Sequence, residues 1–162
     1  MTNRAGQSAI EARLERAAAT MGDLTAPVMA EYYRRFPEAR ASFVHHAPLG
    51  PERLEAEMVG NTLYYVMTWF ESPVEARIYF DTSVPHHRVA LDVPPDWFRG
   101  MIDTLIDVVE AGVPAVDAAE QQALLVVGGD DLQVLRGHAL VAVVAGHLLA
   151  LEHLAGVLAL AG

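Results

Sequence analysis

Histidines are the main candidates for chemistry in this sequence, which has seven of them and no cysteine. Without cysteine the chain has no thiolate metal site, cysteine nucleophile or disulfide. His138, His147 and His153 are nine and six residues apart, and these offsets do not return to one helix face, so we do not expect them to chelate a metal. Of the adjacent pair His45-His46, at most one is expected to point inward. Both are expected to cap or line a loop.

The pair His86-His87 has the most informative surroundings. It follows a predicted helix that Pro85 interrupts or ends, and it precedes a helix start at Pro94-Pro95-Asp96, after which come Trp97 and Phe98. A histidine held at a helix end, with its imidazole facing an apolar pocket, is what haem iron requires as an axial ligand. Taken alone, the same placement also fits an ordinary loop histidine beside a proline.

The elements that must position these histidines are predicted from apolar residues at helical spacing. The first helix ends near Gly22, and the second begins at Thr25, which can cap it. Pro37 then forces a corner before a short irregular stretch that contains Phe43. A later helix begins at Ser72, as an N-cap, and carries Val74, Ile78 and Tyr79 inward. The remaining helices are expected at roughly 50–71, 94–112, 117–128 and 130–162. No long alternating strand pattern occurs, so the prediction is an all-α domain of six to eight helices.

Composition narrows the functional classes. Hydrophobic residues make up 52% of the 162 residues and aromatic residues only 7%, which is typical of a helical protein. The formal net charge of −10 argues against a nucleic-acid partner. The first twenty residues do not resemble a secretory signal, and a cytoplasmic location is expected.

The segment 139–162 is long and apolar enough to raise the question of a membrane-spanning helix. His147, Glu152 and His153 interrupt it, and no cluster of basic residues flanks it. We therefore expect no membrane insertion, and a helix buried in protein or in a dimer interface instead.

Several segments resemble the globin family in order and spacing. The stretch 32–43, from Tyr32 to Phe43, is similar to the second helix of bacterial globins with its proline corner and the phenylalanine that packs on the porphyrin. Arg53-Leu54 stands where the helix over the distal face begins. The segments 86–91 and 94–98 resemble the proximal histidine region of globin-coupled sensors and protoglobins. The resemblance covers about residues 10 to 160.

This resemblance implies a single globin-like sensor domain over residues 1–162, with haem b as cofactor and oxygen, NO or CO as ligand. It also implies signal output and homodimer formation through the last two helices, 96–111 and 132–160. The alternative is a globin-fold regulatory or dimerisation module without haem. A haem enzyme, such as a peroxidase or a nitric oxide dioxygenase, is the least supported reading, because no nucleotide-binding glycine motif or distal acid-base pair is evident.

The resemblance leaves two choices open at the iron. His87, ten residues before Trp97, is the first choice for the proximal ligand. His86 is the alternative, since it matches the sensor pattern locally but requires two extra residues before the proline pair. On the distal side, sensor-type spacing implies Tyr32 as a hydrogen-bond donor to bound oxygen, whereas a register counted back from Pro37 implies Met29 instead.

Other positions follow from the same resemblance. Leu54 is expected above the iron as an apolar gate, and Phe43 is expected to stack on the porphyrin. Arg53 and Arg88 would pair with the haem propionates, because a guanidinium suits a carboxylate at a pocket rim. The expected pocket walls, which core packing would explain equally well, are Met58, Thr62, Trp97 and Met101.

Overall fold

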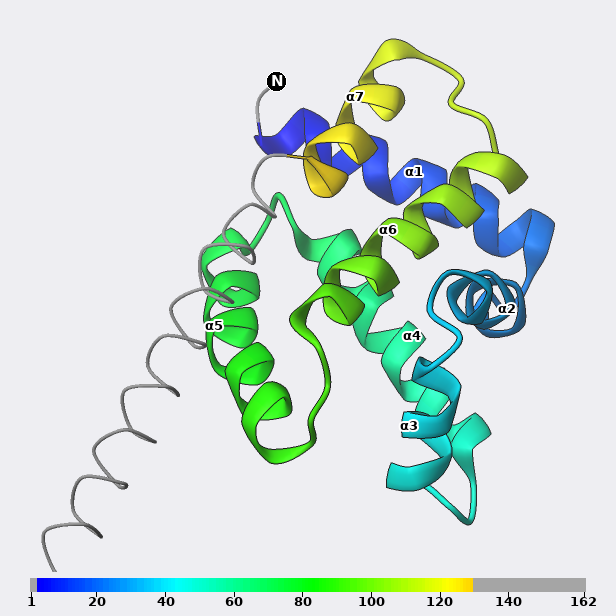
Figure 1. Cartoon of the computed structure of the whole chain (residues 1–162). Coiled ribbons are helices and arrows are strands. Elements are labelled where there is room, and N and C mark those ends of the chain that lie inside the picture. Colours follow the sequence, from blue (N-terminus) through cyan, green and yellow to red (C-terminus); the bar gives the residue numbers. More distant parts are fainter. Residues whose placement is uncertain (1–2, 130–162) are drawn as a thin grey trace, which may run out of the picture.

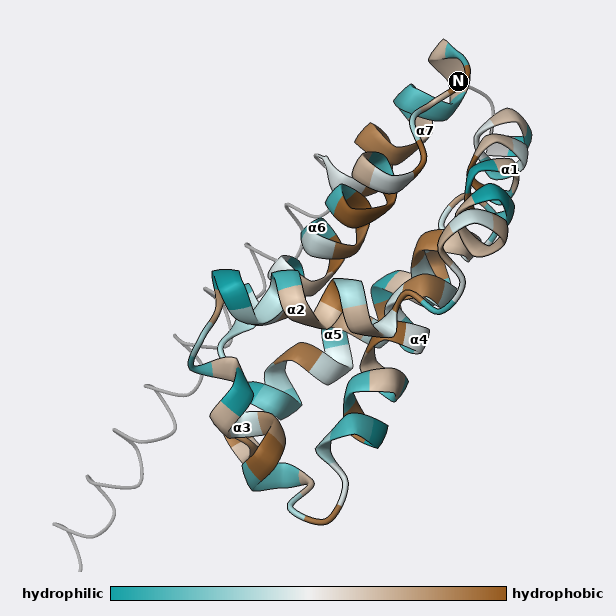
Figure 2. Ribbon diagram, turned by 90° about the vertical axis from the view of Figure 1, so that its right-hand side faces the viewer, coloured by the Kyte–Doolittle hydropathy of each residue, from teal (hydrophilic) through white to brown (hydrophobic). Residues whose placement is uncertain are grey.

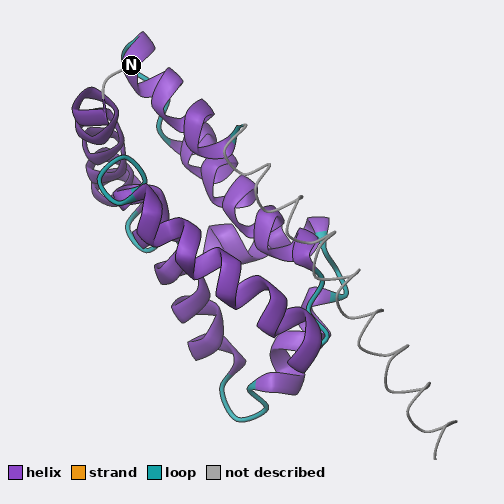
Figure 3. Cartoon of the chain, turned by 90° about the vertical axis from the view of Figure 1, so that its left-hand side faces the viewer, coloured by secondary structure: helices purple, strands orange, loops and turns teal. Residues whose placement is uncertain are grey.

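The computed structural model describes residues 3–129, which form seven α-helices and no strand (Figures 1 and 3). In chain order the helices are α1 (Asn3–Met21), α2 (Thr25–Arg35), α3 (Ala39–His46), α4 (Pro51–Thr68), α5 (Pro73–Ala90), α6 (Pro95–Gly112) and α7 (Ala118–Gly128). The all-α prediction is confirmed for this part of the chain. The helix expected at 130–162 lies outside the described residues.

Prolines and short polar side chains set most of the helix starts. Pro51, Pro73 and Pro95 each occupy the first turn of a helix, where the missing N–H would have had no partner. At α7 the Asp117 carboxylate accepts the Glu120 N–H at 2.9 Å, so the predicted cap is confirmed.

The predicted caps at Ser72 and Thr25 have different outcomes. Ser72 is the N-cap residue of α5, as predicted, although its side chain makes no capping hydrogen bond. The prediction for Thr25 is wrong, because the N-cap residue of α2 is Leu24. At the start of α2 the Asp23 carboxylate accepts the Thr25 N–H instead, at 2.8 Å. The acceptor therefore comes from the residue two positions before the one predicted.

Two predicted interruptions are helical. Phe43 lies on α3 rather than on an irregular stretch, and α5 continues through Pro85 to Ala90, so His86 and His87 lie inside a helix. The packing of Val84 before the proline and of His87 against Phe98 after it holds the helix together across that position. Tertiary contacts here outweigh the loss of one hydrogen bond at proline.

The inward face of α5 also differs from the prediction. Ala76, Phe80 and Val84 are buried, whereas Val74 and Ile78 are 67% and 60% exposed. Both sets have helical spacing, so periodicity alone did not identify the side that faces the core.

Helix α6 is the central element of the described fold. It packs against α1, α2, α4, α5 and α7, and α1 packs along α7. Its hydrophobic residues stand out beside those of α7 in Figure 2. The buried residues of α6 are Phe98, Gly100, Met101, Ile102, Thr104, Leu105, Ile106 and Val109. Because α6 touches both ends of the molecule, it connects the α1–α7 packing with the region around α3 and α5 (Figure 1).

Within residues 3–129, no helix is both long and apolar enough to cross a membrane. The apolar segment 139–162 lies beyond these residues.

Candidate functional site

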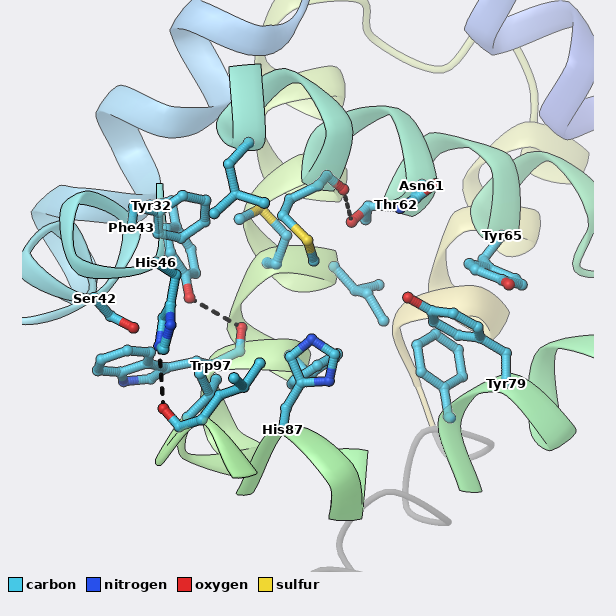
Figure 4. Close-up of a pocket in the computed structure, with 18 of the residues that line it drawn as sticks. Tyr32, Ser42, Phe43, His46, Asn61, Thr62, Tyr65, Tyr79, His87 and Trp97 are labelled. Atoms are coloured by element: carbon cyan, nitrogen blue, oxygen red, sulfur yellow. Dashed lines mark hydrogen bonds between the residues drawn. The ribbon is translucent and has the colours of Figure 1, made fainter. Parts of the chain in front are cut away.

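A cavity of about 380 Å³ lies among helices α2 to α6. Its walls are mostly aromatic and aliphatic, with a few polar groups, and its volume falls in the range of small-molecule pockets (Figure 4). The polar side chains on the wall are those of Tyr32, Ser42, His46, Asn61, Thr62, Tyr65, Tyr79 and His87. The cavity therefore suits a largely apolar ligand that is held by few polar contacts.

His87 points its ring into this cavity from the last turns of α5 (Figure 4). Its Nδ1 lies 2.7 Å from the carbonyl oxygen of Ser83, one turn earlier. Because a carbonyl only accepts, Nδ1 must carry the proton, which in a neutral imidazole leaves a lone pair on Nε2. The edge-to-face contact with Phe98, at 4.9 Å between ring centroids, fixes the ring further. The arrangement holds one nitrogen lone pair, that of Nε2, in a fixed orientation.

The backbone of His87 is fixed as well, because α5 ends just after it. The His87 carbonyl accepts the N–H groups of Leu91 and Val93, each at 3.1 Å. Asp92 between them has a φ of +52°, the left-handed conformation that this type of helix end requires. Leu91 and Val93 then line the cavity beside the histidine. Both the side chain and the main chain of His87 are therefore tied to neighbouring backbone.

The opposite wall comes from α4 and is apolar in character. Leu54 and Met58 lie on it, followed by Thr62 one turn further. The Thr62 hydroxyl donates to the Met58 carbonyl at 2.8 Å, which turns its polar group back to its own helix. The polar groups that α4 leaves for a ligand are therefore the Asn61 amide and the Tyr65 hydroxyl.

Tyr32 extends into the cavity from α2 and is almost fully buried. Its hydroxyl donates to the Trp97 carbonyl at 3.3 Å, a long hydrogen bond. Burial raises the pKa of the Tyr32 phenol well above its usual value. The group therefore stays neutral and keeps its proton, so it acts as a hydrogen-bond donor at any ordinary pH.

His46 was not predicted as a site residue, yet it lies on the wall. Its Nε2 is 3.2 Å from the Leu91 carbonyl, so it bridges α3 to the connection between α5 and α6. The sequence carried a signal, because His46 follows Phe43 by three residues and so shares its face once 39–46 is taken as a helix.

An aromatic end of the cavity was also missed. Tyr65 and Tyr79 stack with centroids 4.4 Å apart, and Phe80 lies 5.4 Å from each of them. All three line the cavity. Their spacing in the sequence gives no hint that α4 and α5 bring them together.

Most of the sequence-predicted site residues come together on the wall, and four do not. Those on the wall are Tyr32, Phe43, Leu54, Met58, Thr62, His87, Trp97 and Met101. His86 is exposed on the outer side of α5, and Met29 is buried in the core away from the cavity lining. Arg88 is exposed and pairs with Asp92 at 2.6 Å. Arg53 is also exposed and does not line the cavity.

Between residues 3 and 129, no group of three or more His, Asp or Glu side chains could hold a metal ion. Among the described residues, His87 is thus a single potential metal ligand on a largely apolar wall. No protein-family model, curated protein or solved structure matches this chain, so the geometry of the cavity carries the functional argument.

Proposed function

We propose that this chain is a globin-like, haem-binding domain that takes up a diatomic gas in the cavity between α4 and α5. The observation that carries the proposal is the orientation of His87, whose Nε2 lone pair faces an apolar cavity while Nδ1 donates to Ser83. A hydrogen bond from the other ring nitrogen to a carbonyl fixes the ring of a metal-binding histidine and makes its free nitrogen a stronger ligand.

The donor set fits haem rather than a bare metal ion. Haem, when bound, brings iron with four porphyrin nitrogens, so one imidazole from the protein is sufficient. A metal ion without a macrocycle would need several side chains, and His87 has no such partners among the described residues. The walls suit a flat apolar group, because Phe43, Met58 and Met101 present aromatic and thioether surfaces.

His46 is better placed than Arg53 or Arg88 to meet carboxylates of the cofactor. Its imidazole lies on the wall and reaches solvent, whereas Arg88 is engaged with Asp92 outside the cavity. We infer that His46 and the neighbouring Ser42 hydroxyl contact the propionates at the open edge.

On the gas-binding side we propose Tyr32 as the polar group. Of the two alternatives, Tyr32 lines the cavity and Met29 does not. The hydrogen bond from the Tyr32 hydroxyl to the Trp97 carbonyl is long, so the hydroxyl can turn to a stronger acceptor.

Tyr32→Phe should raise the oxygen dissociation rate by about tenfold, because it removes one hydrogen bond to bound oxygen. The matched control is Tyr33→Phe, whose hydroxyl donates to Glu55 at 2.7 Å and lies off the cavity wall. An oxygen dissociation rate unchanged by Tyr32→Phe would contradict this role.

A sensing role would use α6, which supplies Trp97 and Met101 to the wall and packs on α7. A shift of these side chains on gas binding would reach the end of α7, from which the chain continues. Output and homodimer formation through the two helices expected at 96–111 and 132–160 are part of this proposal. The second of them is apolar on nearly every side in sequence, so a dimer contact would use only one of its sides. The haem-free module is the weaker alternative, because it would be expected to fill the cavity with bulky side chains, and about 380 Å³ is open.

The deciding experiment is the absorption spectrum of the purified full chain after addition of haem, with two histidine variants. We expect a Soret band from the wild type and from His86→Ala, whose side chain is exposed, and its loss or a large shift in His87→Ala. The adjacent position makes His86→Ala a closely matched control. A wild-type chain that binds no haem would overturn the proposal, and loss of the band only in His86→Ala would overturn the choice of ligand.

A further inference from the structure

Helix α5 has a second apolar side, opposite the one that faces α6. Val74 and Ile78 lie one turn apart on this side, and Pro85 and Val89 fall in the same register two and three turns further, with Asp81 and Thr82 in the turn between them. Val74, Ile78 and Val89 are 67%, 60% and 79% exposed. We refer to these three residues and Pro85 as the outer face of α5. The buried residues of the helix, such as Phe80 and Val84, lie on the other side.

A helix that is apolar on two opposite sides is normally covered on both. Single exposed apolar residues are ordinary, whereas three large ones on one face of one helix mark a candidate interaction surface. Among the described residues, the main neighbour of α5 is α6, which covers only the buried side. In Figure 1 the helix accordingly lies at the edge of the described fold.

The same chain contains a segment of matching chemistry and length. Residues 139–162 hold 24 residues with one carboxylate, Glu152, and no lysine or arginine. As a helix such a stretch is about 36 Å long, and the 18 residues of α5 span about 27 Å. The segment is therefore long enough to cover the outer face from end to end.

The described chain ends beside α6, which packs on the buried side of α5, so the segment that follows has to pass around α5 to reach the outer face. The carbonyl of Gly128, at the end of α7, accepts a hydrogen bond at 3.0 Å from the guanidinium of Arg99 on α6. Arg99 directly follows Phe98, whose ring contacts His87 of α5. The chain thus leaves α7 beside the part of α6 that packs on α5. Residues 130–138 can reach about 30 Å if extended, which is enough to bring the apolar segment to α5.

We propose that residues 139–162 pack against the outer face of α5 in the same molecule. The proposal does not depend on haem. It encloses α5, and with it His87, between α6 on one side and the C-terminal segment on the other.

The absence of native cysteine allows a direct test by thiol labelling of the full chain without lipid. Val74→Cys and Val89→Cys report on the two ends of the face. Val116→Cys is the matched control, because it has the same native residue type and is 70% exposed. Each alkylation rate is divided by that of the same variant unfolded in urea. We expect both outer-face thiols to react at least about tenfold more slowly than the control, as for a site that must open before it reacts.

Two further measurements identify the occupant. Leu148→Asp with Leu151→Asp, in the full chain, should restore fast labelling of Val74→Cys. Protection should also be independent of protein concentration. Equal rates at the outer face and at Val116→Cys in the full chain would overturn the proposal. Protection that disappears on dilution together with a dimer would assign the face to a second copy, and protection seen only with lipid vesicles would assign it to a membrane surface; either result overturns the intramolecular arrangement.

Discussion

The two ends of the molecule are both helical but differ in how closely their side chains pack. Where α1 packs along α7, Ile10, Leu124 and Val127 are almost completely buried. At the same end Met21 of α1 packs against Gly112 of α6 and leaves no room for a side chain there. Where α3, α4 and α5 meet α6, the side chains surround about 380 Å³ of space.

Their polar groups differ in the same way. Between α1 and α7, the Arg16 guanidinium binds both oxygens of the Glu120 carboxylate at 2.6 Å, and Arg13 donates to the Val113 carbonyl at 3.0 Å. These bonds join one helix to distant parts of the chain. Around the cavity, Thr62 and His87 bond to carbonyls one turn back in their own helices. The side chains of Tyr32 and His46 do reach distant carbonyls there, through longer bonds of 3.3 and 3.2 Å. The first end stabilises the fold, whereas the second keeps a shaped space open.

Filling the cavity should therefore produce the largest change in stability. At a free haem concentration about a thousandfold above the dissociation constant, the free energy of unfolding of the wild type should rise by about 4 kcal/mol, because haem would bind the folded state alone. Urea titration with and without haem measures it. His87→Ala should gain much less at the same haem concentration, and an equal gain would show that haem binds without this residue.

Deleting the same side chain at the two ends should give unequal losses. Leu124→Ala should lower the free energy of unfolding by about 3 kcal/mol, because the side chain is fully buried and leaves a new cavity. Leu54→Ala should lower it by about 1 kcal/mol or less, since it only enlarges a space that already exists. Urea denaturation of both variants measures the difference. Equal losses would remove the distinction between the two ends.

The ion pair between α1 and α7 should make that end sensitive to acid. Arg16 holds the pKa of the Glu120 carboxyl below its usual value of about 4.3. Its contribution is therefore fully present above about pH 4.3 and is lost as pH falls through the lower pKa of the folded state. Glu120→Gln should cost about 2 kcal/mol at pH 7 and progressively less at lower pH. Unfolding curves from pH 7 to pH 2.5 test this, and a pH-independent difference would contradict it.

The smallest effect is expected at Arg88, which the globin resemblance had suggested as a propionate partner. It forms an exposed pair with Asp92 outside the cavity, and such pairs contribute little. Arg88→Ala should change the free energy of unfolding by less than about 0.5 kcal/mol and leave haem affinity unchanged. Haem titration of this variant checks it, and a clear loss of affinity would mean that Arg88 turns toward the cofactor.

Local sequence signals predicted the helix boundaries well where one residue decides them. Prolines at 51, 73 and 95 and the Asp117 cap act within a single turn, so no knowledge of the rest of the chain was needed. Pro85 shows the limit of such signals, because contacts with α6 carry the helix across it.

The candidate site was predictable only in part. The α4 positions 54, 58 and 62 lie four residues apart and so share a face, whereas His87 was chosen from the globin resemblance and expected after the helix rather than within it; all four line the cavity. The stack of Tyr65 on Tyr79 depends on how α4 and α5 approach each other, which no local pattern encodes. The inward side of α5 was missed for a related reason, since the helix has apolar residues on both sides.

The end of α5 has a consequence for the timescale of any event at His87. Its carbonyl holds the amides of Leu91 and Val93, so the backbone that carries the imidazole can shift only when this last turn frays. Hydrogen exchange at those two amides would report that opening directly. The fraying of a single helical turn, rather than unfolding of the domain, would then limit how fast the backbone at His87 can move.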